Sequence, residues 1–171
     1  MAAKSITILG IDTSCDDTAV AVLEIRNQKI EIRSNIVSSQ VKLHQKYGGV
    51  YPSLAKREHI KNLPRVYQKA IQGINDKTID FITVTNGPGL EPCLWQGINF
   101  ANDLAEKLKK PLVPVNHIEA HILANLLDSK FLFPAVALVV SGGHTQLILM
   151  EGLGKYRLIC ETRDDAACEC F

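Results

Sequence analysis

The sequence predicts an α/β fold in which a sheet starts with antiparallel strands and continues with parallel strand-helix units. Three short strand-like segments with tight turns between them open the chain, and helix-like and strand-like segments then alternate. Near residue 133, the strand, small polar loop and strand of the N-terminus begin again. We therefore expect one nearly complete domain at residues 1–130 and the beginning of a duplicated second domain at residues 131–171.

The first three segments are predicted as strands because they are rich in β-branched and aliphatic residues and are bounded by turn formers. They cover residues 6–11, 19–25 and 29–38. Residues 40–50 resemble a loop that ends in two glycines. Apolar residues at a helical period then predict a helix that ends at Gly73 and is kinked at Pro64.

The next segments alternate between strands and helices. We expect strands at residues 81–85 and 112–115, and helices at residues 95–108 and from about residue 119 to 127. The second domain is predicted to contain strands at residues 134–140, 147–150 and 156–160, followed by the start of a helix at residues 164–171. The meander followed by strand-helix units supports the α/β prediction.

Two loops of small and polar residues lie between paired strands, DTSCDDT at residues 12–18 and SGGHT at residues 141–145. Glycines, hydroxyls and backbone N–H groups in such loops can turn toward one anion, which predicts a phosphate-bearing ligand. Tight hairpin turns are the alternative, because the same residues favour turns without any ligand. We take Asp16 as a candidate general base, and an exposed acidic turn is its alternative.

Composition indicates an ordinary globular chain of 171 residues, 46% of them hydrophobic. Its apolar stretches are shorter than the ~20 residues of a membrane span, and the residues before the first strand are too few for a signal peptide. The five cysteines are odd in number and lack C-x-x-C pairs, which favours a reducing compartment. We expect a cytoplasmic protein that does not bind a membrane.

Positive charge is concentrated at residues 26–69, which contain ten Lys and Arg residues but only two Glu residues. Tyr47, Tyr51 and Tyr67 are interleaved with these charges. Such a segment could contact nucleic-acid phosphates and stack on bases. Solvated helix faces explain the same pattern equally well.

His117 and His121 are spaced four residues apart, so both lie on one face of a helix and could bind a divalent metal. Two helical histidines with ordinary hydrogen bonds are the alternative. A metalloprotease would need H-E-x-x-H, and here Glu119 follows the first histidine by two residues. Two ligands are too few for zinc or iron, so further ligands must come from elsewhere.

Several motifs together resemble the bacterial TsaD branch of the tRNA threonylcarbamoyladenosine transferases. They are GIDTSCDDT, SSQVKLHQKYGGVYPSLAKREH, NGPGL, HIEAH, VSGGHTQLI and DDAACECF, in that order. The resemblance implies an actin-like, sugar-kinase-like (ASKHA) fold. It also implies transfer of a threonylcarbamoyl group from threonylcarbamoyl-AMP to N6 of adenosine 37, beside the anticodon, in tRNAs that read codons beginning with A.

The resemblance assigns roles to residues of this chain. It places Fe²⁺ or Zn²⁺ on His117 and His121, and it places the adenylate on residues of the V-S-G-G-H stretch, which are Val140, Ser141, Gly142, Gly143 and His144. Thr13 and Ser14 of the first loop are further candidate substrate-binding residues. The implied partners are tRNA, a TsaB-like paralogue, a small ATPase and the enzyme that makes the adenylate.

Departures from the family pattern limit what this chain is expected to do alone. After DDAA the chain contains Cys168 and Cys170 and ends at Phe171, so the family's next substrate-binding Asp and its later metal-binding Asp are absent. We expect the 171-residue chain by itself to bind metal poorly and to turn over little substrate. Two other functions remain open, a carbamoyltransferase acting on a small molecule and a non-catalytic TsaB-like scaffold.

Overall fold

The computed structural model describes residues 5–127, 132–141 and 144–162 of the chain. Contacts divide the chain into two units, Met1–His117 and Ile118–Phe171, each with its own sheet. This division falls earlier than the predicted boundary near residue 130, because contacts follow packing whereas the prediction follows the recurrence of a pattern. The predicted start of a duplicated domain at residue 131 stays a prediction.

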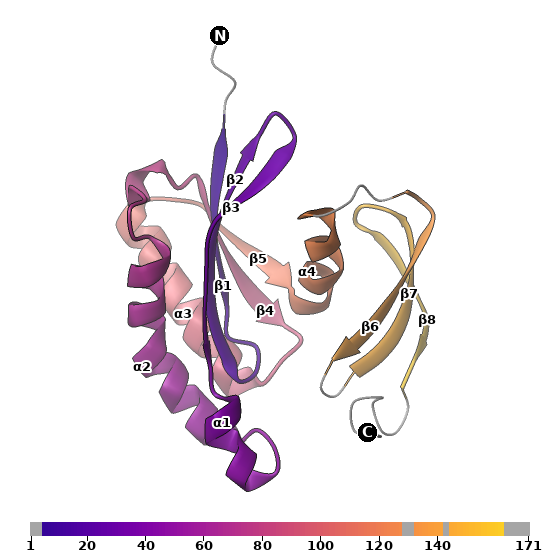
Figure 1. The fold of residues 1–171 in the computed structure, drawn as a ribbon, viewed down its shortest axis with the longest axis horizontal. Coiled ribbons are helices and arrows are strands. Elements are labelled where there is room, and N and C mark those ends of the chain that lie inside the picture. The colour runs from indigo at the N-terminus through magenta and orange to yellow at the C-terminus, as the bar shows by residue number, and fades with distance from the viewer. Residues whose placement is uncertain (1–4, 128–131, 142–143, 163–171) are drawn as a thin grey trace. The chain divides into compact units, whose positions relative to one another are not determined.

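The first unit is built on a five-stranded sheet with the order β3-β2-β1-β4-β5 (Figure 1). β1, β2 and β3 form an antiparallel meander, and β4 and β5 run parallel to β1. The strands are β1 (Ile6–Asp12), β2 (Asp17–Arg26), β3 (Lys29–Ser39), β4 (Phe81–Gly87) and β5 (Leu112–Asn116). This mixed sheet confirms the predicted α/β class.

Two long helices, α2 (Pro52–Ala70) and α3 (Glu91–Leu108), pack together and cover one face of this sheet (Figure 1). Both begin with a proline in the first turn, where the missing N–H is not needed. α2 is one helix through Pro64, and it ends three residues before Gly73. α3 begins four residues earlier than predicted, because Pro92 is tolerated in its first turn.

The core of the first unit lies between the sheet and these helices. Alternate strand residues such as Leu9 and Ile11, Val20 and Val22, and Ile82 and Val84 are buried in it, as a period of two requires for one covered face. Residues 41–47 are not the plain loop predicted for residues 40–50. They form a short helix, α1 (Val41–His44), and a single turn, η1 (Gln45–Tyr47).

The second unit contains α4 (His117–Leu123), which begins at the last residue of the first unit, the turn η3 (Ala124–Leu127), and a three-stranded antiparallel sheet. Its strands are β6 (Ala135–Ser141), β7 (His144–Gly152) and β8 (Lys155–Glu161), in that order. Ile118 and Ile122 of α4 pack on Val139, Ile148 and Met150. The helix predicted from residue 164 lies outside the described residues. No helix in the described part of the chain is both long and apolar enough to cross a bilayer.

Candidate functional site

The candidate site of the first unit lies where the carboxyl ends of β1, β4 and β5 meet. These three strands are parallel neighbours in the sheet, so the residues that follow them are brought to the same edge (Figure 1). Asp12 ends β1, Thr85 lies near the end of β4, and His117 follows β5 directly. The first loop, residues 13–16, leaves the sheet at this edge.

Asp12 accepts four hydrogen bonds that join these elements. Its Oδ1 accepts from the backbone N–H and the hydroxyl of Ser14, both at 2.8 Å. Its Oδ2 accepts from the hydroxyl of Thr85 and from Nδ1 of His117, the latter at 3.0 Å. Since an ionised carboxylate only accepts, His117 carries a proton on Nδ1.

The surroundings of Asp12 keep it ionised. Burial raises its pKa, but the hydrogen bonds from His117, Thr85 and Ser14 outweigh burial and hold the pKa well below its ordinary value of 3.8. With Nδ1 protonated toward Asp12, the lone pair of a neutral His117 lies on Nε2. The Ser14 hydroxyl lies 3.5 Å from this Nε2, but it donates its proton to Oδ1 of Asp12.

This arrangement suits a metal ligand, because metal-binding histidines usually donate their other ring N–H to a carboxylate or carbonyl. His121 lies four residues further along α4 and is exposed. The described residues contain no group of three or more His, Cys, Asp or Glu side chains placed to share a metal. The donor set therefore fits zinc or iron in kind, and a closed site needs ligands from outside the described part of the chain.

Two glycines allow the first loop to pack closely on its neighbours. A Cβ on Gly97 of α3 would lie 2.5 Å from the Thr13 hydroxyl, and a Cβ on Gly89 would lie 2.5 Å from the carbonyl oxygen of Ser14. The buried Thr13 hydroxyl donates to the Cys93 carbonyl at 2.9 Å and accepts from the Gly97 N–H at 3.1 Å. The side chain of Thr13 thus fixes the loop to α3, and its predicted contact with substrate stays a prediction.

His59 of α2 supports the same loop from below and is fully buried. Its Nε2 donates to the carbonyl of Cys15 at 3.0 Å, and its Nδ1 accepts from the Thr18 hydroxyl at 2.8 Å. Burial lowers the pKa of His59, so the ring is neutral at pH 7. The sequence interpretation missed this residue, although its spacing from Ala55 and Leu63 places it on the buried face of the helix.

Asp16 and Cys15 form the outer part of the loop and are half-buried. Burial and the neighbouring Asp16 carboxylate raise the pKa of Cys15 to about 12, and burial raises the pKa of Cys93 to about 11. Neither thiol is a nucleophile at neutral pH, because the thiolate is the reactive form. Among these three side chains, Asp16 is the group able to accept a proton, and its role as base stays a prediction.

The second predicted loop lies between β6 and β7. Ser141 pairs with His144 at the ends of these strands, and Gly142 and Gly143 lie outside the described residues. The side chain of Val140 is half-exposed. The predicted contacts of Val140, Ser141, Gly142, Gly143 and His144 with an adenylate stay predictions.

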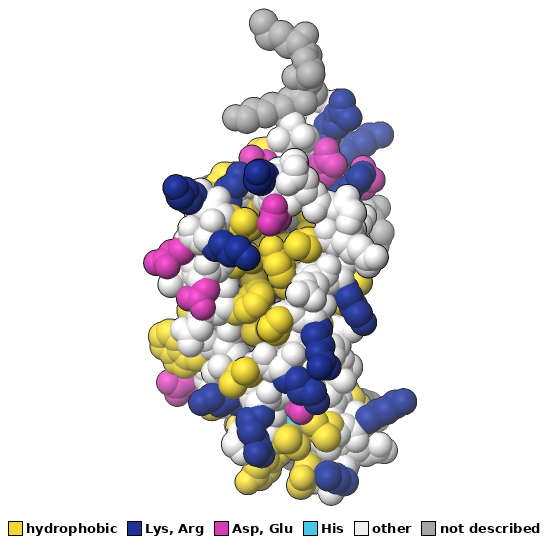
Figure 2. All heavy atoms as spheres, turned by 90° about the vertical axis from the view of Figure 1, so that its left-hand side faces the viewer, with side chains coloured by type: hydrophobic (Ala, Val, Ile, Leu, Met, Phe, Trp, Pro, Cys, Tyr) yellow, Lys and Arg dark blue, Asp and Glu magenta, His cyan; other side chains and the backbone are white. Residues whose placement is uncertain are grey.

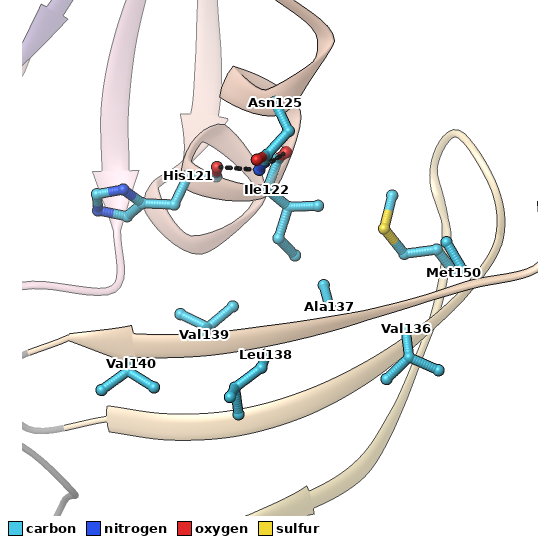
Figure 3. A pocket seen from close by; sticks show the side chains of 10 residues that line it. His121, Ile122, Asn125, Val136, Ala137, Leu138, Val139, Val140 and Met150 are labelled. Atoms are coloured by element: carbon cyan, nitrogen blue, oxygen red, sulfur yellow. Dashed lines mark hydrogen bonds between the residues drawn. The ribbon is translucent and has the colours of Figure 1, made fainter. Parts of the chain in front are cut away.

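The second unit also contains a pocket of about 470 Å³ beside β6. Figure 3 shows Ala137 and Val139 directed toward Ile122 of α4, whereas Leu138 and Val140 point to the opposite side of the strand. Asn125 donates to the carbonyl of Ile122 at 2.9 Å. The ring of His121 extends away from Ile122 and the strand residues (Figure 3). The residues that line the pocket are mostly hydrophobic, and His121 and Asn125 line it with them.

Comparison with known proteins places the chain in a family. The model of the TsaD family, tRNA N6-adenosine threonylcarbamoyltransferase, matches residues 31–171. Relatives of that name are 50% identical over 166 residues in Persephonella marina, 51% over 173 in Thermomicrobium roseum and 48% over 170 in Geobacillus thermodenitrificans. The matches cover 96%, 96% and 98% of this chain and 47%, 47% and 49% of the relatives. The chain thus spans about half the length of the curated relatives it matches.

Solved structures agree on the fold. YeaZ from Pseudomonas aeruginosa aligns with a TM-score of 0.59 at 17% identity, over 92% of this chain and 66% of that one. A Ppx/GppA family protein from Aquifex aeolicus aligns with a TM-score of 0.55 at 15% identity, over 93% of this chain and 51% of that one. These likenesses confirm the predicted actin-like (ASKHA) fold. With the family model matching most of the chain, this protein belongs to the TsaD family of tRNA N6-adenosine threonylcarbamoyltransferases.

Proposed function

We propose that this chain supplies one half of the catalytic apparatus that transfers a threonylcarbamoyl group from threonylcarbamoyl-AMP to N6 of adenosine 37 in tRNA. The observation that carries the proposal is the identity of about 50%, over 96% of the chain, with relatives named for this reaction. The carboxylate-held His117 beside a hydroxyl-rich loop supports it, because both suit an activated acyl phosphate.

In this proposal, His117 and His121 bind one divalent metal ion, Fe²⁺ or Zn²⁺, together with ligands from outside the described residues. When bound, such a metal would polarise the carbonyl of the carbamoyl-phosphate anhydride. Asp12 is the positioning residue, since its hydrogen bond to Nδ1 sets the orientation of the His117 ring and leaves the lone pair on Nε2.

The transfer itself needs a base and a place for the leaving group. The N6 amine of adenosine attacks the carbamoyl carbon, the bond from that carbon to the phosphate oxygen breaks, and AMP leaves. Asp16 accepts the proton that the amine loses. The adenylate is held in this proposal by residues of the two loops, whose N–H groups face its phosphate. These residues are Thr13, Ser14, Val140, Ser141, Gly142, Gly143 and His144.

Partner proteins are part of the proposal. The face formed by α2 and α3 carries apolar side chains that gather between Lys and Arg side chains (Figure 2). Ile60 of α2 and Trp95 of α3 are each about half-exposed on these helices. Exposed apolar residues of this size favour a protein contact, and we assign it to a TsaB-like paralogue. A small ATPase and an adenylate-forming enzyme complete the proposed cytoplasmic system.

A chimera tests the function directly. Residues 1–171 of this chain replace the matching half of the Persephonella marina relative, and the product is incubated with threonylcarbamoyl-AMP and a tRNA transcript. We expect threonylcarbamoyladenosine in nuclease digests, and its loss in a His117→Ala chimera. The unmodified relative is the positive control. AMP release that does not depend on tRNA, without modified nucleoside, would favour a small-molecule acceptor and overturn the proposal.

A further inference from the structure

We infer that Tyr47 and Tyr51 form a stacking platform for an unpaired base of RNA, with Lys42 and Lys46 beside it to contact phosphate. The inference rests on the proposed function, because it assigns a contact surface for the tRNA substrate. It concerns α1, η1 and the residues up to Tyr51, which directly precedes α2. The predicted fold treated residues 40–50 of this stretch as a plain loop.

The two tyrosine rings are arranged as one surface. Their centroids are 5.5 Å apart and their planes differ by 27°, so the rings stack. Each tyrosine is 52% exposed, which leaves about half of its surface in contact with solvent. The Lys46 ammonium lies 5.0 Å from the centroid of the Tyr47 ring and adds a cation–π contact. A base that stacks here would meet an aromatic surface and a positive charge together.

The platform is held in place from inside the protein. His44 is buried, donates from Nε2 to Oε1 of Gln40 at 3.1 Å, and accepts the backbone N–H of Tyr51 on Nδ1 at 3.2 Å. Gly48 has a φ of 71°, a conformation that favours glycine, and lets the chain turn between the two tyrosines. Because folding fixes the rings beforehand, RNA would not have to order them on binding.

The platform is also connected to the first loop of the candidate site. The backbone N–H of Gln40 donates to the carbonyl of Asp16 at 3.0 Å. The segment that carries the tyrosines therefore begins next to the proposed base. An RNA that presents one adenosine to Asp16 would have neighbouring unpaired nucleotides within reach of this segment.

Charge favours RNA over a protein as the occupant. Residues 40–61 contain five Lys and Arg residues and one acidic residue, Glu58, which pairs with Lys61 at 3.4 Å. Within the described parts of the chain, Lys42, Lys46 and Lys56 make no ion pair. At the lower end of the face in Figure 2, apolar and basic side chains lie together, at the height of α1 in Figure 1. Such a mixture suits a polyanion with exposed bases.

Of the three tyrosines interleaved with basic residues in the sequence, Tyr67 does not join the stacked pair. Tyr67 is half-buried, lies against the core cluster and packs edge-on on Phe100, with ring centroids 5.7 Å apart. Burial raises its pKa, in keeping with this position. The aromatic contact is therefore confined to Tyr47 and Tyr51.

Binding of a labelled hairpin RNA with the sequence of a tRNA anticodon arm tests the platform. Fluorescence anisotropy compares the 171-residue chain with Tyr51→Leu, Tyr47→Leu and the conservative variant Tyr51→Phe. One lost stacking contact should weaken binding about tenfold or more, whereas Tyr51→Phe should stay within about twofold of wild type. A hairpin of the same length without unpaired bases should not distinguish the variants.

The charge contact has its own readout. Lys46→Ala should lower the salt dependence of binding by about one phosphate contact. Lys29→Ala is the matched control, because Lys29 begins β3 and lies at the opposite end of that strand from Ser39, about 30 Å away. It should leave both the affinity and the salt dependence unchanged.

Three outcomes would overturn the inference. The first is that the wild-type chain does not bind the RNA. The second is that folded Tyr47→Leu and Tyr51→Leu chains bind the RNA as tightly as wild type. The third is that these variants keep RNA binding and lose only the binding of a TsaB-like protein. The chimera assay separates this inference from the proposed function. If the chimera makes the modified nucleoside and the tyrosine variants bind RNA normally, only the platform is refuted. If the chimera makes no modified nucleoside and the variants lose RNA binding, only the transfer reaction is refuted.

Discussion

Replacing Asp12 by Asn tests whether this carboxylate sets the state of His117. The Asn side chain keeps one acceptor oxygen and puts an NH₂ group where the second oxygen was, so two of the four donors around Asp12 lose their acceptor. If the NH₂ group faces His117, it donates to Nδ1 and moves the ring proton to Nε2. The substitution would then remove the lone pair that a metal needs.

The magnitudes follow from these contacts. A hydrogen bond to a charged group contributes about 1.5–3 kcal/mol, and removing a buried charge recovers part of the desolvation cost. We therefore expect the free energy of unfolding to fall by about 2–4 kcal/mol. Losing the carboxylate that orients a ligand typically weakens metal affinity about 10–100-fold, which is about 1.4–2.7 kcal/mol.

The assay is competition of each variant with a chromophoric chelator for Zn²⁺, in the 171-residue chain and in the chimera, with urea unfolding as the stability measurement. Asp80→Asn is the matched control, since Asp80 accepts from the Thr7 N–H at 2.8 Å at the other end of β1. It should lower stability without changing zinc affinity. Equal zinc affinity in folded D12N and D80N proteins would refute the proposed role of Asp12.

Four further results are expected. Burial lowers the pKa of His59, so on acidification the unfolded chain takes up a proton at this histidine before the folded chain does. The free energy of unfolding should therefore be complete above about pH 6.5 and fall as pH drops through the lowered pKa. His59→Gln should flatten the pH dependence of the urea midpoint. Gly97→Ala should cost about 1–3 kcal/mol in thermal unfolding because its Cβ meets Thr13, whereas Gly49→Ala, with no neighbour within 4 Å, should change stability by less than about 0.5 kcal/mol; equal losses would contradict the packing argument. Peptide mapping after alkylation at about pH 8 should find exposed Cys160 labelled before Cys15 and Cys93, whose raised pKa values keep them protonated, and the opposite order would be inconsistent with their burial. Leu138, 66% exposed on a strand that pairs only with β7 among the described strands, should promote self-association, so Leu138→Lys should shift sedimentation toward monomer.

The sequence was sufficient to predict most strands and helices because each depends on a local period. Alternation marks the strands whose residues Leu9, Val20 and Ile82 enter one core, and a helical period marks α2 and α3. The short helix at residues 41–44 has no such period, because it is held by Gln40 and His44 instead of by an apolar face. Patterns of hydrophobicity could not reveal it.

The contacts of the candidate site were less accessible to sequence reasoning. Asp12 meets Thr85 and His117 across 73 and 105 residues of chain, and their meeting depends on the parallel order of β1, β4 and β5. Spacing along the chain identified His117 as a ligand candidate but could not supply its carboxylate partner. Tyr67 shows the opposite error. A tyrosine among basic residues suggested a surface position, but its place on the helix turns the ring toward the core, where it is half-buried.

The contacts that hold the first loop predict two groups of variants, which differ in their effects on stability and on ligand affinity. The hydroxyl of Thr13 bonds to α3, Ser14 bonds to Asp12 of β1 and to the segment between β4 and α3, and the carbonyl of Cys15 bonds to His59 of α2. His59 is itself held by Thr18 of β2. Folding therefore fixes the loop before any ligand arrives. Substitutions beneath the loop, at His59 or Gly97, should therefore lower stability and ligand affinity together. Substitutions at His117, a quarter of whose side chain is exposed at the edge of the sheet, should lower metal affinity with a smaller effect on stability. The two groups separate residues that build the site from those that act in it.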